Sequence, residues 1–258
     1  MASAASRPLP SGFRHEPHAS LPSTSAAAFE RARAGEASGL WVTAAEQTAG
    51  KGRRGRSWTT GAGNLAASLL LIDPAPPTVA ATISFVAGLA LHQAAVDVGG
   101  PAIAERLSLK WPNDLLLDRQ KVAGILVEGE KLVGDRFAVV VGVGVNCTSH
   151  PEIAGAYLAT DFRARGVAME ADALFARLAH RMVEEITRWN AGSGFAAIRA
   201  AWLTRCSGLG EPIRVNLAGR EVDGRFEALD DAGRLVLVHA TGARETFSAG
   251  DVFLAAAG

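Results

Sequence analysis

The segment from residue 50 to residue 63 holds the side chains best suited to chemistry in this chain. It alternates five glycines with four positively charged side chains: Gly50, Gly52, Gly55, Gly61, Gly63, Lys51, Arg53, Arg54 and Arg56. Glycine lets backbone N–H groups approach a ligand closely, and the planar guanidinium of arginine pairs with carboxylate or phosphate through two hydrogen bonds. The segment therefore predicts a loop that holds anions.

Residues 50–55 also fit the pattern G-x-G-x-x-G of dinucleotide-binding turns. In such a turn a helix begins immediately, and backbone amides bind the phosphate. Here Ser57, Trp58 and two further glycines follow, and then an apolar run at 65–72 predicts a strand. The pattern is therefore not a dinucleotide fingerprint, although Asp73 lies near the expected distance for its acid. The sequence also has no P-loop, zinc-protease, serine-hydrolase or kinase motif.

The composition of the 258 residues, 48% hydrophobic and 20% charged, suits one large folded domain and a small one. The 26 basic and 26 acidic residues cancel, which argues against a surface that coats nucleic acid.

Cys147 and Cys206 lack metal-site spacing and are expected to be free thiols, so we expect a reducing, cytoplasmic location. Residues 1–20 carry three prolines and no signal-peptide core; they predict a flexible tail, with a transit peptide as the less favoured alternative. We expect no apolar run to span a membrane.

The first 206 residues mix predicted helices and strands, which indicates an α/β (α+β) domain. Ser23 is positioned to cap a helix that ends at Gly35 or Gly39. Further helices are predicted from hydrophobic periodicity at 84–98, 170–190 and 195–205. Strands are predicted at 40–44, 65–72, 106–110, 115–117, 122–129 and 137–145.

From residue 207 the pattern changes to short alternating runs separated by glycine-containing turns. The runs lie at 213–217, 221–229, 235–239 and 245–247. Such a series predicts a small antiparallel barrel or sandwich. We therefore expect a tail at 1–20, a catalytic domain at 21–206 and a β domain at 207–258.

Four motifs resemble those of the biotin protein ligases, the enzymes that attach biotin to carboxylase carrier proteins. The segment AGKGRRGRSW at 49–58 is similar to the family's GRGRRGR-W loop. The motifs KWPND at 110–114, KVAGILVE at 121–128 and GVGVN at 142–146 follow in the family's order. The resemblance, which extends from about residue 22 to the C-terminus, implies a class II synthetase-like mixed-sheet domain followed by an SH3-like β domain.

The resemblance implies a two-step ligase reaction. The carboxylate of biotin attacks the α-phosphate of ATP to give biotinyl-5′-AMP, and a lysine of the acceptor then attacks this mixed anhydride. The implied acceptor is a biotin carboxyl carrier protein or domain, as in acetyl-CoA carboxylase, and the implied cofactors are ATP and Mg²⁺. Cations must screen the two anions, and a lid must exclude water. The glycine-rich loop is suited to both tasks.

The resemblance also implies a role for individual residues, with Lys121 and Arg53 as the catalytic pair. It places eleven residues around biotin: Ser23, Thr24, Ser25, Gln47, Gly50, Lys51, Gly52, Arg53, Lys121, Gly124 and Gly142. It places eight around ATP or the adenylate: Arg53, Arg54, Arg56, Trp58, Asn113, Asp114, Lys121 and Asn146. Asp114 is also a candidate Mg²⁺ ligand. The chain departs from the family in having Ser25 where asparagine is usual and Lys51 in place of arginine.

Several alternatives stay open at this point. Lys110 competes with Lys121 for the central role, but Lys110 is expected to be a structural surface lysine. Trp111 is expected to be a core residue, and Asn146 is weighed as a simple strand end. A lipoate-type ligase is the nearest rival function, and a nucleic-acid-binding module is the rival from another class. Only about 20 residues precede Ser23, too few for a helix-turn-helix domain, so we expect no sequence-specific DNA binding. A homodimer is compatible with the sequence.

Overall fold

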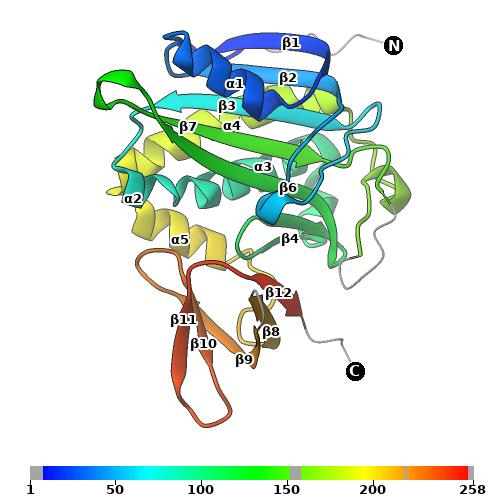
Figure 1. Ribbon diagram of the computed structural model, residues 1–258. Helices are drawn as coiled ribbons and strands as arrows, with labels where there is room; N and C mark the ends of the chain where they lie inside the picture. The colour runs from blue at the N-terminus through cyan, green and yellow to red at the C-terminus, as the bar shows by residue number, and fades with distance from the viewer. Residues whose placement is uncertain (1–7, 152–157, 218–219, 255–258) are drawn as a thin grey trace.

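The computed structural model describes residues 8–151, 158–217 and 220–254, and these form a seven-stranded sheet and a separate five-stranded sheet (Figure 1). The strand order in the large sheet is β1-β2-β3-β7-β6-β5-β4. Its neighbouring strands are antiparallel, except that β1 and β2 run parallel. The strands are β1 (Arg14–Leu21), β2 (Leu40–Gln47), β3 (Leu65–Ile72), β4 (Leu107–Lys110), β5 (Asp114–Leu117), β6 (Gln120–Lys131) and β7 (Phe137–Val145).

Helices cover both faces of this sheet (Figure 1). The helix α1 (Thr24–Arg33) packs against β2, β3 and β7 on one face. The long helices α3 (Ile83–Gly99) and α4 (Ala171–Trp189) lie together on the other face, where α5 (Phe195–Leu203) packs against both; the short α2 (Pro77–Ala80) precedes α3. A mixed sheet between helical layers confirms the predicted mixed α/β fold class.

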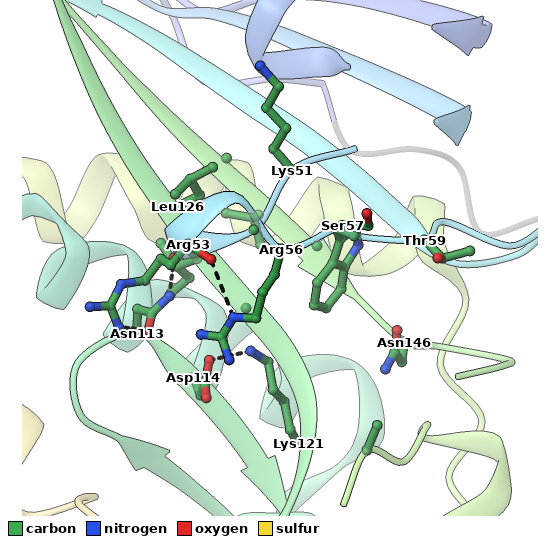
Figure 2. Close-up of a pocket in the computed structure, with 18 of the residues that line it drawn as sticks. Lys51, Arg53, Arg56, Ser57, Thr59, Asn113, Asp114, Lys121, Leu126 and Asn146 are labelled. Atoms are coloured by element: carbon green, nitrogen blue, oxygen red, sulfur yellow. Dashed lines mark hydrogen bonds and ion pairs between the residues drawn. The ribbon is translucent and has the colours of Figure 1, made fainter. Parts of the chain in front are cut away.

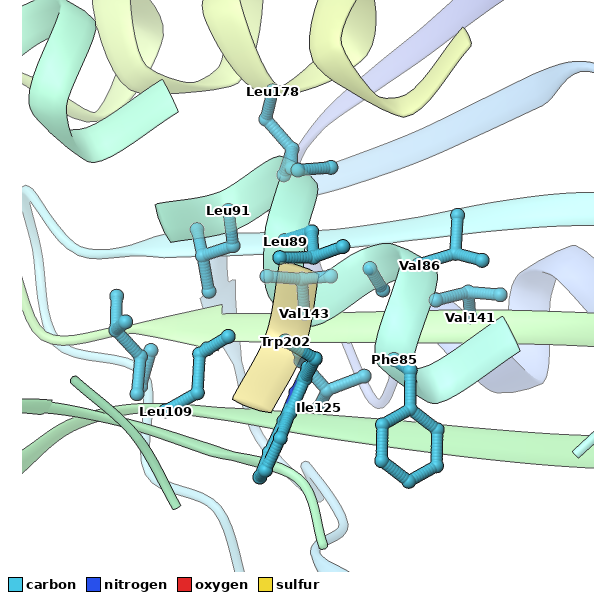
Figure 3. Close-up of a cluster of buried hydrophobic side chains, with 14 of the residues drawn as sticks. Phe85, Val86, Leu89, Leu91, Leu109, Ile125, Val141, Val143, Leu178 and Trp202 are labelled. Atoms are coloured by element: carbon cyan, nitrogen blue, oxygen red, sulfur yellow. The ribbon is translucent and has the colours of Figure 1, made fainter. Parts of the chain in front are cut away.

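Successive side chains of the central strands point to opposite faces of the sheet, and this explains why the protein has two separate hydrophobic cores. Leu69 and Val141 belong to the core beneath α3 and α4, whereas their neighbours Leu70 and Val140 belong to the smaller core beneath α1. Successive side chains of a strand point to opposite faces, so an entirely apolar strand is suited to the middle of three layers. Figure 3 shows Val141 beside the α3 side chains, with Leu89 at the centre of the cluster.

The C-terminal strands form an antiparallel sheet in the order β11-β10-β9-β8-β12. They are β8 (Pro212–Leu217), β9 (Arg220–Leu229), β10 (Leu235–Val238), β11 (Arg244–Phe247) and β12 (Asp251–Leu254). The last strand, which the sequence pattern did not predict, returns to pair with β8. The two parts of the chain touch directly, since Trp111 Nε1 donates to the Gly233 carbonyl at 3.0 Å. The small antiparallel β domain is therefore confirmed, while its SH3-like character and the boundary at 206/207 stay predictions.

The expectation of a flexible tail at residues 1–20 is wrong for its second half. Arg14–Leu21 form the edge strand β1, paired along its length with β2. Its side chains are mostly exposed, and it includes Pro17, which an edge strand tolerates. Backbone hydrogen bonds and contacts such as His15 Nε2 to Thr43 Oγ1 at 2.7 Å hold it in place. Such a strand has no apolar pattern to reveal it in the sequence.

The expectation about membrane-spanning length also needs correction. Residues Pro77–Gly99 are long and apolar enough to cross a membrane by length and composition. In the structure 72% of the apolar window is buried inside the protein, because α3 lies between the sheet, α4 and α5. Its hydrophobicity therefore reflects its place in the core.

Candidate active site

One pocket gathers nearly all of the predicted site residues. It lies between the glycine-rich loop and the strands β6 and β7, and the C-terminal domain closes one side through Asp251 and Val252. The predicted residues that line it are Ser23, Thr24, Ser25, Gln47, Lys51, Gly52, Arg53, Arg56, Trp58, Asn113, Asp114, Lys121, Gly124, Gly142 and Asn146. Gly50 and Arg54 are predicted site residues that do not line it.

The glycine-rich loop is a small hairpin folded over this pocket. Lys51 and Ser57 form an antiparallel bridge, and Gly52 N donates to the Arg56 carbonyl at 2.7 Å. A turn at Arg53–Gly55 reverses the chain. Gly50 has a structural role here, because a Cβ at this position would collide with the backbone of the returning strand.

The four cations of the loop point to different partners. Arg53 Nη1 donates to Asn113 Oδ1 at 3.0 Å, and burial lowers the pKa of this guanidinium. Arg54 and Arg56 instead lie against the carboxylate of Asp251, at 3.2 and 3.0 Å. Lys51 is exposed, and Figure 2 shows its side chain extending away from Arg53. The loop therefore places Arg53 in the pocket and ties two of its arginines to the C-terminal domain.

A buried carboxylate between two lysines lies at the base of the pocket. Lys121 Nζ is 2.6 Å from Asp114 Oδ1, and Lys110 Nζ is 3.2 Å from Asp114 Oδ2 (Figure 2 shows the first pair). Burial by itself raises the pKa of Asp114, but the two ammonium groups outweigh it, so the pKa lies below its ordinary value. Burial lowers the pKa of Lys110, although Asp114 opposes the shift. The Lys121 side chain is 25% exposed against 5% for Lys110, so Lys121 is the lysine that a ligand can reach.

An aromatic ring lines the pocket beside Lys121. Lys121 Nζ lies 5.7 Å from the centre of the Trp58 ring. The indole fits because β7 carries Gly144 beneath it, and a Cβ at that position would collide with the ring. A Cβ at Gly124 would lie 3.3 Å from the same ring and 3.2 Å from Lys121 Nζ. The glycines of β6 and β7 thus leave room for the Trp58 indole against the sheet.

Hydroxyl and amide groups form the opposite, polar end. Gln47 Oε1 accepts from Thr24 N at 2.9 Å and from Thr24 Oγ1 at 3.1 Å. Ser68 Oγ lies 2.7 Å from Thr24 Oγ1 and 3.0 Å from Ser25 Oγ. Gly142 makes space for this group, since a Cβ there would lie 2.8 Å from Ser25 Oγ. Ser23 caps α1 as predicted, with its hydroxyl accepting from Ala26 N at 3.4 Å, and also lines the pocket.

Asn146 directly follows β7 and is buried. Its Nδ2 donates to the Thr160 carbonyl at 3.1 Å, and its backbone N donates to Val122 O. The side chain therefore has a structural bond to the segment opposite, and it lines the pocket as well.

The geometry does not fit Asp114 as a Mg²⁺ ligand. Each of its two oxygens faces a lysine ammonium, so the single negative charge of the carboxylate already has two positive partners. Among the described residues no group of three His, Cys, Asp or Glu side chains is placed to hold a metal. A cation of the Mg²⁺ type prefers several oxygen ligands.

Some pocket residues had no sequence-based role. Asp251 and Val252 come from the C-terminal domain, and only the fold brings them to the loop. The expectation that Lys110 lies at the surface is wrong, because its side chain is buried. It lines the pocket and donates to the Val252 carbonyl at 3.4 Å. The remaining lining residues are Ser57, Thr59, Trp111, Pro112, Ile125, Leu126, Val143, Gly144, Pro151 and Ala159.

A mixed sheet with a cationic loop over a two-ended pocket, joined to a small β domain, defines a two-domain α/β protein that binds small molecules. The biotin/lipoate A/B protein ligase family matches residues 18–146, and the biotin protein ligase C-terminal domain matches residues 208–255. The chain belongs to this ligase family, as the sequence motifs predicted.

Known relatives are similar to this chain over most of the length of both proteins. The chain is 41% identical to the biotin–(acetyl-CoA-carboxylase) ligase of Paracoccus denitrificans over 90% of this chain and 96% of that protein. It is 37% identical to the same enzyme of Mycobacterium tuberculosis over 89% of this chain and 85% of that protein. The fold is similar to the biotin protein ligase of Aquifex aeolicus in complex with biotin and ATP, with a TM-score of 0.75, 24% identity and coverage of 93% and 97% of the two chains.

Proposed function

We propose that this protein is a biotin–(acetyl-CoA-carboxylase) ligase. It activates biotin with ATP as biotinyl-5′-AMP and transfers the biotinyl group to a lysine of a biotin carboxyl carrier protein or domain. The observation that carries the proposal is the two-ended pocket: hydroxyl and amide groups at one end, an aromatic ring and cations at the other, and Lys121 between them. These match the ureido ring, the adenine and the two reacting anions of a biotin–ATP pair.

In the first step a carboxylate oxygen of biotin attacks the α-phosphorus of ATP, and pyrophosphate leaves. Both reactants are anionic, so their approach requires positive charge held at the reacting atoms. We assign that role to Lys121, whose position is fixed by Asp114 at 2.6 Å, and to Arg53, whose guanidinium is oriented by Asn113. Biotin would contact Ser23, Thr24, Ser25, Gln47, Gly52, Lys121, Gly124 and Gly142, with Gly50 and Lys51 shaping the loop. ATP would contact Arg53, Arg56, Trp58, Asn113, Lys121 and Asn146, with Arg54 acting through the loop's attachment to Asp251.

In the second step the amine of the acceptor lysine attacks the acyl carbon, and AMP leaves with the bonding electron pair. The amine must lose a proton to react, and the anhydride must be kept from water in the meantime. The hairpin at residues 50–58 lies over the pocket and supplies that cover. No nucleophile from the protein is required.

We propose that Mg²⁺ enters with the phosphates of ATP. This ion commonly keeps several water ligands and binds through substrate phosphates, so it does not need a cluster of protein carboxylates. A cytoplasmic location fits the two free cysteines, Cys147 and Cys206. A homodimer remains a proposal, for which sedimentation with and without biotin and ATP is the direct measurement.

The function is tested by mass spectrometry of a carrier domain after incubation with the protein, biotin, ATP and Mg²⁺. The expected product gains one biotinyl group on one lysine. Reactions without ATP, and reactions with a carrier whose acceptor lysine is replaced by arginine, serve as controls. A mass gain of a lipoyl group when lipoate is supplied, with none from biotin, would establish the rival function instead.

A further inference from the structure

A continuous chain of hydrogen bonds lies behind the polar end of the pocket. It runs from Ser25 to Ser68 at 3.0 Å, from Ser68 to Thr24 at 2.7 Å, and from Thr24 to Gln47 at 3.1 Å. Ser68 is completely buried in β3 and does not line the pocket, so it contacts a ligand only through its neighbours. It is a single hydroxyl in the apolar strand LAASLLLI, directly opposite Gly142 of β7.

The chemistry of these groups allows the hydroxyl hydrogens to be donated in one direction only along this chain. A carboxamide oxygen accepts and never donates, so the contact between Thr24 Oγ1 and Gln47 Oε1 uses the hydroxyl hydrogen of Thr24. Thr24 N donates to the same oxygen at 2.9 Å, which fixes the orientation of the Gln47 amide. With its one hydrogen committed, Thr24 must accept from Ser68. Ser68 must in turn accept from Ser25.

This direction determines what the pocket offers to a ligand. Ser25 has given its hydrogen to Ser68, so toward the pocket its oxygen presents lone pairs. Gln47 Nε2 donates one hydrogen to Thr60 Oγ1 at 3.1 Å, and an amide nitrogen carries a second. The polar end therefore pairs an acceptor at Ser25 with a donor at Gln47. A ligand that fits it must bring an N–H donor beside a carbonyl acceptor.

We propose that Ser68 is a positioning residue that selects the substrate by fixing the direction of this hydrogen-bond chain. The proposal rests on the proposed function, and it specifies why the pocket takes a cyclic urea. The ureido ring of biotin has two N–H donors and a carbonyl. The dithiolane ring of lipoate has neither, so it would leave the pocket-facing lone pair of Ser25 and the second amide hydrogen of Gln47 unpaired, and polar groups that lose water without gaining a partner disfavour binding.

The matched pair of variants is Ser68→Thr and Ser68→Val, which have the same shape but differ in the hydroxyl. Both place an extra methyl group next to Gly142, so any effect of crowding is common to them. Ser68→Ala removes the hydroxyl without crowding. Ser207→Ala, a buried serine in the connection between the domains, is the control for losing a buried hydroxyl elsewhere.

Biotin binding is measured by calorimetry without ATP, followed by the Michaelis constants for biotin and ATP. The ligands are biotin and its two analogues methylated on one ureido nitrogen. We expect Ser68→Val and Ser68→Ala to weaken biotin binding about tenfold, the size of one lost hydrogen bond, with kcat and the Michaelis constant for ATP unchanged. We expect Ser68→Thr to retain binding close to that of the original protein.

Discrimination between the two methylated isomers of biotin is the measurement that a purely structural role of Ser68 would not change. The original protein should reject one methylated isomer much more strongly than the variants do, because only a directed Ser25 requires the N–H. Equal biotin binding by Ser68→Val and Ser68→Thr, or discrimination unchanged in all variants, would overturn the inference. A failure of the original protein to bind biotin at all would instead overturn the proposed function.

Discussion

Asp251 Oδ1 lies 3.0 Å from Arg56 Nη2, which joins the first residue of β12 to a loop 195 residues earlier in the chain. The same carboxylate holds Arg54 at 3.2 Å and is only 18% exposed. Two arginines of the loop are thus anchored on the C-terminal domain. This contact gives the small β domain a direct influence on the pocket, because it holds the loop in place above Lys121.

We expect Asp251→Asn to raise the Michaelis constant for ATP by about five- to tenfold. Each ion pair near the surface contributes roughly 0–1 kcal/mol, and both are weakened together. Steady-state kinetics with varied ATP measures the effect, and faster proteolysis within residues 50–58 would report the loosened loop. Asp223→Asn, which removes an exposed partner of Arg214 in the same domain, is the control. A lower Michaelis constant for ATP would mean that Asp251 competes with phosphate, and the anchoring role would then be wrong.

We expect Lys121→Ala to reduce adenylate formation by at least about a hundredfold while the fold is retained. Removing a charge held at the transferred group has effects of this size. The fold should persist because Asp114 keeps Lys110 as a partner at 3.2 Å. Pyrophosphate release measures the first step, and circular dichroism checks the fold. Lys131→Ala, on the exposed end of the same strand, is the matched control. Undiminished pyrophosphate release would remove Lys121 from the mechanism.

Two glycines of β7 provide a test of the two-ended pocket. A Cβ at Gly144 would collide with the Trp58 indole, whereas a Cβ at Gly142 would lie 2.8 Å from Ser25 Oγ. We expect Gly144→Ala to raise the Michaelis constant for ATP about tenfold and Gly142→Ala to raise that for biotin by a similar factor. Each should change the constant for the other substrate much less. Kinetics with each substrate varied in turn decides the matter, and equal effects of both variants on both substrates would contradict the assignment of the ends.

These glycines also show what the sequence could predict. Gly142 and Gly144 stand two apart in a strongly β-prone run, so they share a face, and glycine within a strand indicates a close neighbour. The order of the motifs then indicated that the loop, Lys121 and this strand belong to one site. Local patterns of this kind predicted the four longer helices and most strands, and the family resemblance supplied 15 of the 28 residues that line the pocket.

The features of the fold and of the site that the sequence did not predict depend on contacts between distant segments of the chain. Asp251 is one acid among several in a β domain, and only the return of β12 to β8 brings it to the loop. Ser68 is a small residue in an apolar strand, and its role depends on a neighbouring helix start at Thr24. The edge strand β1 is polar and is held by backbone pairing, which leaves no hydrophobic period in the sequence.

The edge strand β1 also makes stability depend on pH through Glu16. Its carboxylate accepts from Arg31 Nη2 at 2.8 Å and Nε at 2.9 Å, and it lies 2.7 Å from His18. The hydrogen bonds from Arg31, aided by His18, lower the pKa of Glu16 from 4.5 to about 2. A carboxyl group whose pKa is lower in the folded state stabilises the fold fully above its unfolded pKa. That contribution is lost as the pH falls from about 4.5 to about 2.

We therefore expect Glu16→Gln to lower the free energy of unfolding by about 1 kcal/mol at pH 7, a modest value because solvent screens the pair. The difference should shrink below pH 4.5 and approach zero near pH 2, where the carboxyl group is protonated in both states. Urea unfolding at a series of pH values measures it, with Glu46→Gln, an exposed acid near the end of β2, as the control. A difference that stays constant from pH 7 to pH 3 would show that the contact between β1 and α1 does not depend on the charge of Glu16.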